Sequence, residues 1–119
     1  MPTAPTPLRS EIWVVRFDPA VGAEIRKLRP ALVVSDNDVG RLPLRIVVPI
    51  TDWKPAYAAF PWFVDIPADA GNGLSKLSGA DAFQTKSISL ARFRQRLGVV
   101  TASQMEAVSS AIAMCVGAP

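Results

Sequence analysis

A charged segment directly before a predicted buried strand holds the residue types that could bind and cleave a phosphodiester. Glu24, Arg26, Lys27 and Arg29 follow Gly22 within one short span. A carboxylate can act as a general base, and a guanidinium can bind a phosphate in a bidentate manner and stabilise charge that develops on it. Attack by an RNA 2′-hydroxyl on its own phosphate requires these two functions. The same residues also fit a solvated Glu–Arg pair, which is common on protein surfaces.

Two further residues stand where predicted strands begin or end. Pro30 fixes φ and lacks an N–H, which suits the first residue of the strand predicted over 30–35. Thr51 ends the strand predicted over 44–51, and its hydroxyl could reach a phosphate oxygen or simply begin a turn. The charged segment is therefore expected to be a loop that a rigid strand holds at one end, as binding residues often are.

Two other groups of residues could contact a polyanion. The longest span with charges of one sign could follow a phosphate backbone, or it could be a solvated face. Its members are Lys86, Arg92, Arg94 and Arg96. A group of aromatic residues could stack unpaired bases or line an interface between two copies of the chain. These residues are Trp53, Tyr57, Phe60 and Trp62.

The composition excludes several classes of enzyme. The 119-residue chain has no histidine and one cysteine, so it lacks a Ser-His-Asp or Cys-His nucleophile and a histidine or multi-thiolate zinc site. It also has no phosphate-binding glycine motif and no dinucleotide fingerprint. We therefore expect no metal and no cofactor. The net charge of +3 permits a polyanionic partner without requiring one.

The chain has the composition of a globular protein, with 50% hydrophobic and 19% charged residues. No apolar run approaches the roughly 20 residues of a membrane span, and no secretory signal is recognisable. We expect a cytoplasmic protein that makes no contact with membranes. Its predicted organisation is a flexible tail over 1–9 and a single domain over 10–117.

The order of elements predicts a mainly β fold. Runs of β-branched and aromatic residues predict six short strands. They are expected over 11–17, 30–35, 44–51, 62–66, 77–87 and 96–100, with a short helical turn over 89–94. A capping box formed by Thr101 and Gln104 begins a helix with Met105, Val108, Ile112 and Cys115 on one face, and Gly117 ends it. This order predicts a small, strongly curved, barrel-like sheet that the helix closes.

Across nearly its whole length the sequence resembles the MazF/PemK family of toxin endoribonucleases. The resemblance rests on Glu-Ile-Trp-Val-Val at 11–15, Asp-Pro-Ala-Val-Gly-Ala-Glu at 18–24, Arg-Lys-Leu-Arg-Pro-Ala-Leu-Val-Val-Ser at 26–35, Val-Val-Pro-Ile-Thr at 47–51 and Gly-Leu-Ser-Lys-Leu-Ser at 73–78. It implies a compact SH3-like barrel of short antiparallel strands with a C-terminal helix, which works as a homodimer. It also implies a MazE-like cognate antitoxin that covers the RNA groove.

The resemblance further implies metal-independent, sequence-specific cleavage of single-stranded RNA, such as mRNA, to give a 2′,3′-cyclic phosphate and a 5′-hydroxyl. The catalytic residues of the family fall on Arg29, Glu24 and Thr51. The RNA-binding residues expected here are Gly22, Arg26, Lys27, Pro30, Gln84 and Lys86. Arg29 would neutralise the phosphate, Glu24 would remove the 2′-hydroxyl proton and Thr51 would hold a non-bridging oxygen. In a variant of this mechanism Arg29 performs the acid–base chemistry and Glu24 organises the loop.

Two positions depart from the family pattern. Ser10-Glu11 replaces the Gly-Asp that relatives often carry before the first strand, and Asp52 replaces the serine that often follows the threonine. A carboxylate beside a phosphate site is unfavourable unless it points away or meets a cation. Two alternatives stay open. One is a non-catalytic toxin of the same fold that acts by binding a protein, as gyrase poisons do, and the other is an inactive RNA-binding relative.

Overall fold

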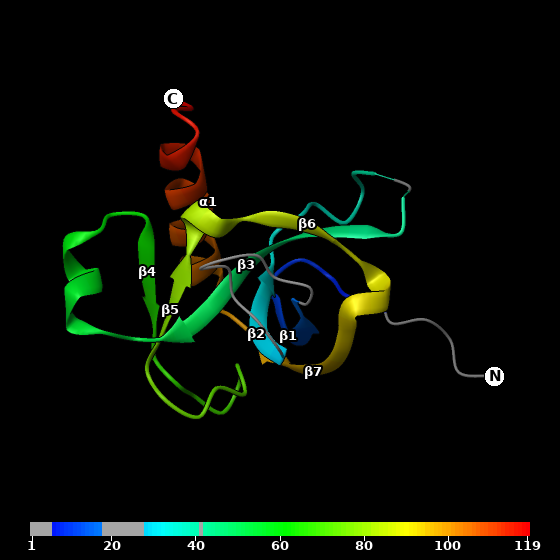
Figure 1. Cartoon of the computed structure of the whole chain (residues 1–119), viewed down its shortest axis with the longest axis horizontal. Coiled ribbons are helices and arrows are strands. Elements are labelled where there is room, and N and C mark those ends of the chain that lie inside the picture. Colours follow the sequence, from blue (N-terminus) through cyan, green and yellow to red (C-terminus); the bar gives the residue numbers. More distant parts are fainter. Residues whose placement is uncertain (1–5, 18–27, 41) are drawn as a thin grey trace.

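Seven strands, one α-helix and three short 3₁₀ helices make up the part of the chain that the computed structural model describes, residues 6–17, 28–40 and 42–119. The strands are β1 (Glu11–Arg16), β2 (Leu28–Val33), β3 (Leu44–Asp52), β4 (Phe63–Ile66), β5 (Ser78–Asp81), β6 (Lys86–Ser89) and β7 (Phe93–Val99). The 3₁₀ helices are η1 (Pro55–Ala59), η2 (Ala82–Gln84) and η3 (Leu90–Arg92), and α1 (Ala102–Cys115) follows the last strand (Figure 1).

The long strand β3 organises the sheet because it pairs with three other strands. Residues 47–49 of β3 pair with β2, residues 44–47 with β6 and residues 50–52 with β5, all in the antiparallel sense. The strand order is β4-β5-β3-β2-β1-β7, with β6 outside this path. In Figure 1, β6 and β7 bend around β1 and β2. The predicted β fold with a C-terminal helix is confirmed, although no pairing among the described residues closes the sheet into a complete barrel.

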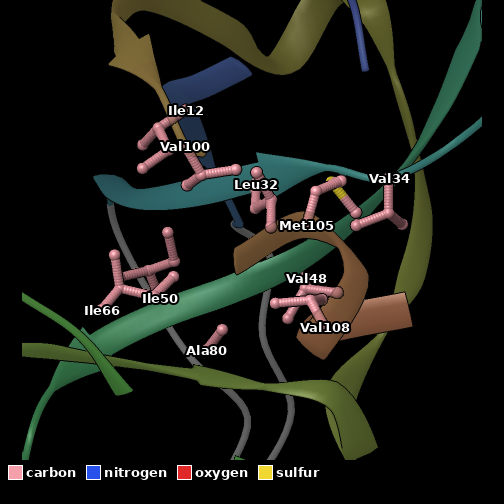
Figure 2. Close-up of a cluster of buried hydrophobic side chains, with 10 residues drawn as sticks. All are labelled: Ile12, Leu32, Val34, Val48, Ile50, Ile66, Ala80, Val100, Met105 and Val108. Atoms are coloured by element: carbon pink, nitrogen blue, oxygen red, sulfur yellow. The ribbon is translucent and has the colours of Figure 1, made fainter. Parts of the chain in front are cut away.

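Two apolar clusters lie on opposite faces of β2 and β3, because successive residues of a strand point to opposite faces. Leu32 and Val48 point to one face, where they belong to the same buried cluster as Met105 and Val108 of α1 (Figure 2). The other face lies inside the curve of the sheet. Its buried residues are Val15, Phe17, Ala31, Val33, Val47, Ile88 and Phe93. Burial on both faces explains why these two strands have nearly continuous apolar sequences.

Three strand boundaries differ from those predicted. The strand predicted over 77–87 is wrong as a single element, because Asp81 ends β5 and its carboxylate accepts a hydrogen bond from the Phe83 N–H, which begins η2. The second strand begins at Leu28 and ends at Val33, so Pro30 is its third residue and not its first. β7 begins at Phe93, directly after η3, which lies within the predicted helical turn.

The predicted helix is confirmed, and the predicted capping box begins it. Thr101 Oγ1 accepts the Gln104 N–H at 3.1 Å, and Gln104 Oε1 accepts the Thr101 N–H at 2.9 Å. Met105 and Val108 are buried as predicted. Gly117, with φ of +67°, follows the end of the helix in a conformation that favours glycine. Within the described ranges, no helix is long and apolar enough to cross a membrane.

Glu11 connects the turn before β1 to the neighbouring edge strand β7. Its Oε1 accepts hydrogen bonds from the Leu8 N–H at 2.8 Å and the Trp13 indole at 3.0 Å, and its Oε2 pairs with Arg96 Nε at 2.8 Å. Burial alone would raise the pKa of this carboxyl, but the hydrogen bonds and the Arg96 charge outweigh burial and lower the pKa. Glu11, the departure from the family pattern noted above, therefore stabilises the fold in its ionised form.

This lowered pKa predicts a pH-dependent contribution of Glu11 to stability. A group whose pKa is lower in the folded state stabilises above its unfolded pKa, and the contribution is lost as the pH falls through the folded value. Glu11→Gln should therefore reduce the free energy of unfolding near neutral pH by about 1–2 kcal/mol. The difference from the original protein should shrink in acid below the ordinary pKa of 4.5. Urea unfolding at several pH values measures both effects, and Glu106→Gln on the exposed side of α1 serves as the control.

Candidate active site at the ends of β2 and β3

Arg29 and Thr51 lie at the same rim of the sheet. Ala31 opposite Pro49 is the last pair of the β2–β3 ladder, and Arg29 and Thr51 each stand two residues beyond it, at the same end of the ladder. The period of two along a strand then places both side chains on the face inside the curve. Arg29 is exposed and also pairs with Val15 of β1, whereas Thr51 is half-buried. A guanidinium and a hydroxyl therefore flank one stretch of surface, where both could contact one phosphate.

Aromatic rings border Thr51 on the side of β5. Thr51 pairs with Gly79, and a Cβ atom at that glycine would lie 3.0 Å from Trp53 Cε3 and 3.3 Å from Phe63 Cδ1. The two rings occupy the space that a side chain opposite Thr51 would otherwise fill. Tyr57 joins them, with its ring stacked on Phe63 at a centroid distance of 4.0 Å and edge-on to Trp53 at 5.7 Å.

The aromatic contacts continue from this group to η2. Phe60 lies 6.2 Å from Phe63 and stacks on Trp62 at 4.9 Å, with an interplanar angle of 12°. The Trp62 ring lies 6.0 Å from the ring of Phe83. A continuous row of rings therefore begins two residues after Thr51 and ends at Phe83, directly before Gln84.

Asp52 meets a cation and points away from the rim. Its Oδ2 lies 2.9 Å from Lys76 Nζ, and both side chains are exposed. Asp52 is opposite Ser78 in the β3–β5 ladder, one residue beyond Thr51, so its side chain leaves the strand on the opposite face. Because Asp52 points away from Thr51 and is paired with a cation, it is compatible with a phosphate site at Thr51.

Asp81 and Gln84 are joined at the start of η2. Asp81 is buried, and its Oδ2 accepts a hydrogen bond of 2.9 Å from Gln84 Nε2. Gln84 itself is exposed. The predicted RNA-contacting amide is thus held by a carboxylate that sequence analysis did not single out. The signal that could have identified Asp81 is an aspartate at the end of an apolar strand. Its side chain can accept the backbone N–H two residues later and so end the strand in a turn.

Lys86 lies at a second, more polar part of the same face. It pairs with Val47 of β3, and its Nζ lies 5.6 Å from the centroid of the Phe17 ring. Lys86, Phe17 and Arg92 line a hollow of about 130 Å³ together with Ser87 and Ile88. Arg92 Nη1 also donates to the Arg16 carbonyl at 3.2 Å. Two cations at the edge of a polar hollow could accept an anionic group.

The rest of the basic span contributes to the fold. Arg94 Nη1 donates to the Ala91 carbonyl at 2.6 Å, and Arg96 pairs with Glu11. These contacts favour the interpretation of Arg94 and Arg96 as structural and solvated residues. Within the described residues, no group of three or more acidic or cysteine side chains could hold a metal ion.

The remaining predicted site residues are divided between the described and undescribed parts of the chain. Pro30 is half-buried in β2 opposite Val14. Gly22, Glu24, Arg26 and Lys27 lie outside the described residues.

Comparison with known proteins identifies the family of the chain. Residues 8–116 match the family described as PemK-like, MazF-like toxin of type II toxin-antitoxin system. The chain is 33% identical over 110 residues to Endoribonuclease MazF9 of Mycobacterium tuberculosis, an alignment that covers 87% of this chain and 91% of the relative. It is 48% identical over 46 residues to Endoribonuclease PemK of Escherichia coli, covering 36% of this chain and 33% of that protein.

Solved structures share the fold over most of its length. MazF from Deinococcus radiodurans superposes with a TM-score of 0.77 at 25% identity, covering 93% of this chain and 96% of that one. An endoribonuclease in complex with its cognate antitoxin from a mycobacterial species superposes with a TM-score of 0.74 at 20% identity, covering 96% and 98% of the two chains.

The close contact at Gly79 predicts the effect of adding one methyl group beside Thr51. Gly79→Ala should lower the free energy of unfolding by about 1–3 kcal/mol, because the new methyl carbon would force the Trp53 and Phe63 rings to move. Urea unfolding followed by tryptophan fluorescence measures this loss. Gly71→Ala is the control, since its Cβ would meet only the Asp69 carboxylate, at 3.3 Å. Equal stability of the Gly79→Ala variant and the original protein would contradict the packing described here.

Proposed function

Because the chain belongs to the PemK-like, MazF-like family of toxins of type II toxin-antitoxin systems, we propose that it is an endoribonuclease that cleaves single-stranded RNA such as mRNA. The names of the relatives MazF9 and PemK support this activity. The structural observation that carries the proposal is the end of the β2–β3 ladder, where Arg29 and Thr51 each stand two residues beyond the last pair, Ala31 and Pro49. An RNA substrate also favours a cytoplasmic location for the protein.

The proposed reaction is an attack of the 2′-hydroxyl on the adjacent phosphorus. A bond forms between the 2′-oxygen and phosphorus, and the bond from phosphorus to the 5′-oxygen breaks. The products are a 2′,3′-cyclic phosphate and a 5′-hydroxyl, which takes up a proton. Arg29 stabilises the charge on the pentavalent phosphate, and Thr51 donates a hydrogen bond to a non-bridging oxygen. Glu24 accepts the proton of the 2′-hydroxyl, unless Arg29 performs this step and Glu24 organises its loop.

The reaction needs no metal ion, because the substrate supplies the nucleophile and Arg29 supplies the positive charge. Gln84 and Lys86 extend the binding surface along the side of β3 that faces β5 and β6. Lys86 stands beside the polar hollow and would contact a backbone phosphate. Gly22, Arg26, Lys27 and Pro30 complete the proposed RNA contacts. We also propose a MazE-like cognate antitoxin that covers this surface, which the antitoxin complex of a structural neighbour supports.

The proposed role of Arg29 predicts a specific loss of activity. Arg29→Ala should reduce the cleavage of a single-stranded oligonucleotide in EDTA by at least about a hundredfold, because the charge on the phosphate loses its stabilising partner. Since Arg29 is exposed, circular dichroism should show an unchanged fold. Arg94→Ala is the matched control, because its guanidinium bonds to the Ala91 carbonyl. Near-normal cleavage by the Arg29→Ala variant would overturn the assignment.

The same assay separates the nuclease from the non-catalytic alternative. Intact RNA together with inhibition of a purified topoisomerase would favour a toxin that acts by binding a protein. RNA that is bound and remains intact would indicate an inactive RNA-binding relative.

We propose that the protein works as a homodimer, and an exposed apolar surface supports this assembly. A hollow of about 360 Å³ lies between the segment that joins β2 to β3 and the helix α1, with Val39, Ile46 and Ile112 in its lining. Leu42 and Leu44 are exposed and line a smaller hollow that shares Val39 and Ile46 with the first. Contiguous apolar surface of this kind commonly marks a contact with another protein. A second copy of the chain could bury the hollow and the neighbouring side chains together.

A charge placed on this surface should dissociate the dimer. Ile46 is 43% exposed at the edge of the hollow, and Ile46→Asp should raise the dimer dissociation constant by at least about tenfold. Light scattering coupled to size-exclusion chromatography measures the change. Leu77→Asp is the control, because Leu77 is 44% exposed and does not line the hollow. A dimer that tolerates Ile46→Asp as well as Leu77→Asp would exclude this surface as the interface.

A further inference from the structure

The buried Asp81 carboxylate determines which way the Gln84 amide faces. Oδ1 of Asp81 accepts the Phe83 N–H at 3.1 Å, and Oδ2 accepts Gln84 Nε2 at 2.9 Å. A carboxylate oxygen accepts hydrogen bonds, so the amide turns its NH₂ group toward it. The amide oxygen, Gln84 Oε1, is left as an acceptor with no hydrogen bond from the described residues. The orientation of this amide therefore follows from chemistry and not from an arbitrary assignment of its O and N atoms.

Phe83 presents an exposed ring between these two polar residues. Its side chain is 69% exposed, although the preceding Ala82 is buried and donates its N–H to the Trp62 carbonyl at 3.1 Å. The Asp81 carboxylate holds the backbone N–H of Phe83, so the ring projects from a short, fixed turn. An exposed aromatic ring on a fixed turn is a surface on which an unpaired base can stack.

We propose that Asp81, Phe83 and Gln84 form a subsite for one unpaired RNA base that carries an exocyclic amino group. The base stacks on Phe83, and its amino N–H donates to Gln84 Oε1. Adenine and cytosine offer this donor, whereas inosine and uracil present a carbonyl oxygen at the corresponding atom, which repels Oε1. Asp81 is a positioning residue, because it acts on the base only through the amide that it orients. The proposal rests on the endoribonuclease function and adds a basis for its sequence preference.

The subsite lies close to the proposed reaction centre. Asp81 is the last residue of β5, and the register of the β3–β5 ladder pairs Ile50 with Ala80 and Thr51 with Gly79. Continuing that register sets Asp81 opposite Pro49 on the face that carries Thr51. A base bound at η2 therefore belongs to a nucleotide near the cut phosphate. This placement favours RNA as the occupant of Phe83 over a second copy of the chain.

The experiment compares substrates that differ by one amino-to-carbonyl exchange. Cut sites are first mapped on a long transcript, and oligonucleotides are then made with cytosine against uracil, or adenine against inosine, at each position around the cut. We expect one position at which the original protein prefers the amino-bearing base by about tenfold in kcat/KM. Asp81→Asn should lower this ratio to one or below, because the asparagine oxygen still accepts the Phe83 N–H while its NH₂ group lets Gln84 turn over and present its own NH₂ group to the base.

Four further variants make the outcome decisive. Gln84→Ala should remove the preference at the same position, and this variant decides the matter if Asp81→Asn does not fold. Phe83→Ala should raise KM for all sequences without changing the ratio. Phe83→Trp, which keeps an aromatic ring, should have the KM of the original protein. Asp65→Asn, an exposed carboxylate of β4, is the control and should keep the preference.

Other outcomes overturn the proposal. They are a preference that survives Asp81→Asn or Gln84→Ala, no amino-over-carbonyl preference at any position, or a Phe83→Ala variant that dissociates the dimer with unchanged KM. Each of these outcomes can be observed only if the original protein cleaves RNA. The absence of any RNA cleavage by the original protein in EDTA would instead refute the proposed nuclease function, so the two failures are distinguishable.

Discussion

The antiparallel register of β2 and β3 is the constraint on which the proposed site depends. Both strands are buried on their two faces, and a shift by one residue would exchange all their inward and outward side chains. The same register leaves Arg29 and Thr51 at one end of the ladder, each two residues beyond its last pair. Packing of the core therefore also positions the two groups that would contact the phosphate, although neither group belongs to the core.

The strand β5 and the turn after it hold the residues of the proposed base subsite. Gly79 leaves room for the rings of Trp53 and Phe63 beside Thr51, and Asp81 stops the strand and holds Gln84. A buried carboxylate is unfavourable unless its oxygens are hydrogen-bonded, and Asp81 meets this requirement through Phe83 and Gln84. The bonds that make its burial possible are the bonds that orient the amide.

Much of the fold and part of the site could be predicted from the sequence. The capping box at Thr101, the apolar runs of β2 and β3 and the placement of Arg29 and Thr51 at strand ends are local patterns, which a sequence reveals directly. The division of 77–87 into two strands was missed, because it depends on the Asp81 side chain replacing a ladder partner. The cation that meets Asp52 was also unpredictable, since Lys76 comes from a loop that tertiary packing brings close.

The central claim is that the RNA supplies its own nucleophile at a phosphate held by Arg29 and Thr51. A chimeric oligonucleotide with a single 2′-deoxy nucleotide on the 5′ side of the mapped cut tests this claim most directly. In EDTA, the account predicts no cleavage of the chimera at that position, while the all-RNA strand yields a fragment that mass spectrometry identifies as a 2′,3′-cyclic phosphate. Cleavage of the chimera at the same bond, or a fragment with a 5′-phosphate, would contradict the account.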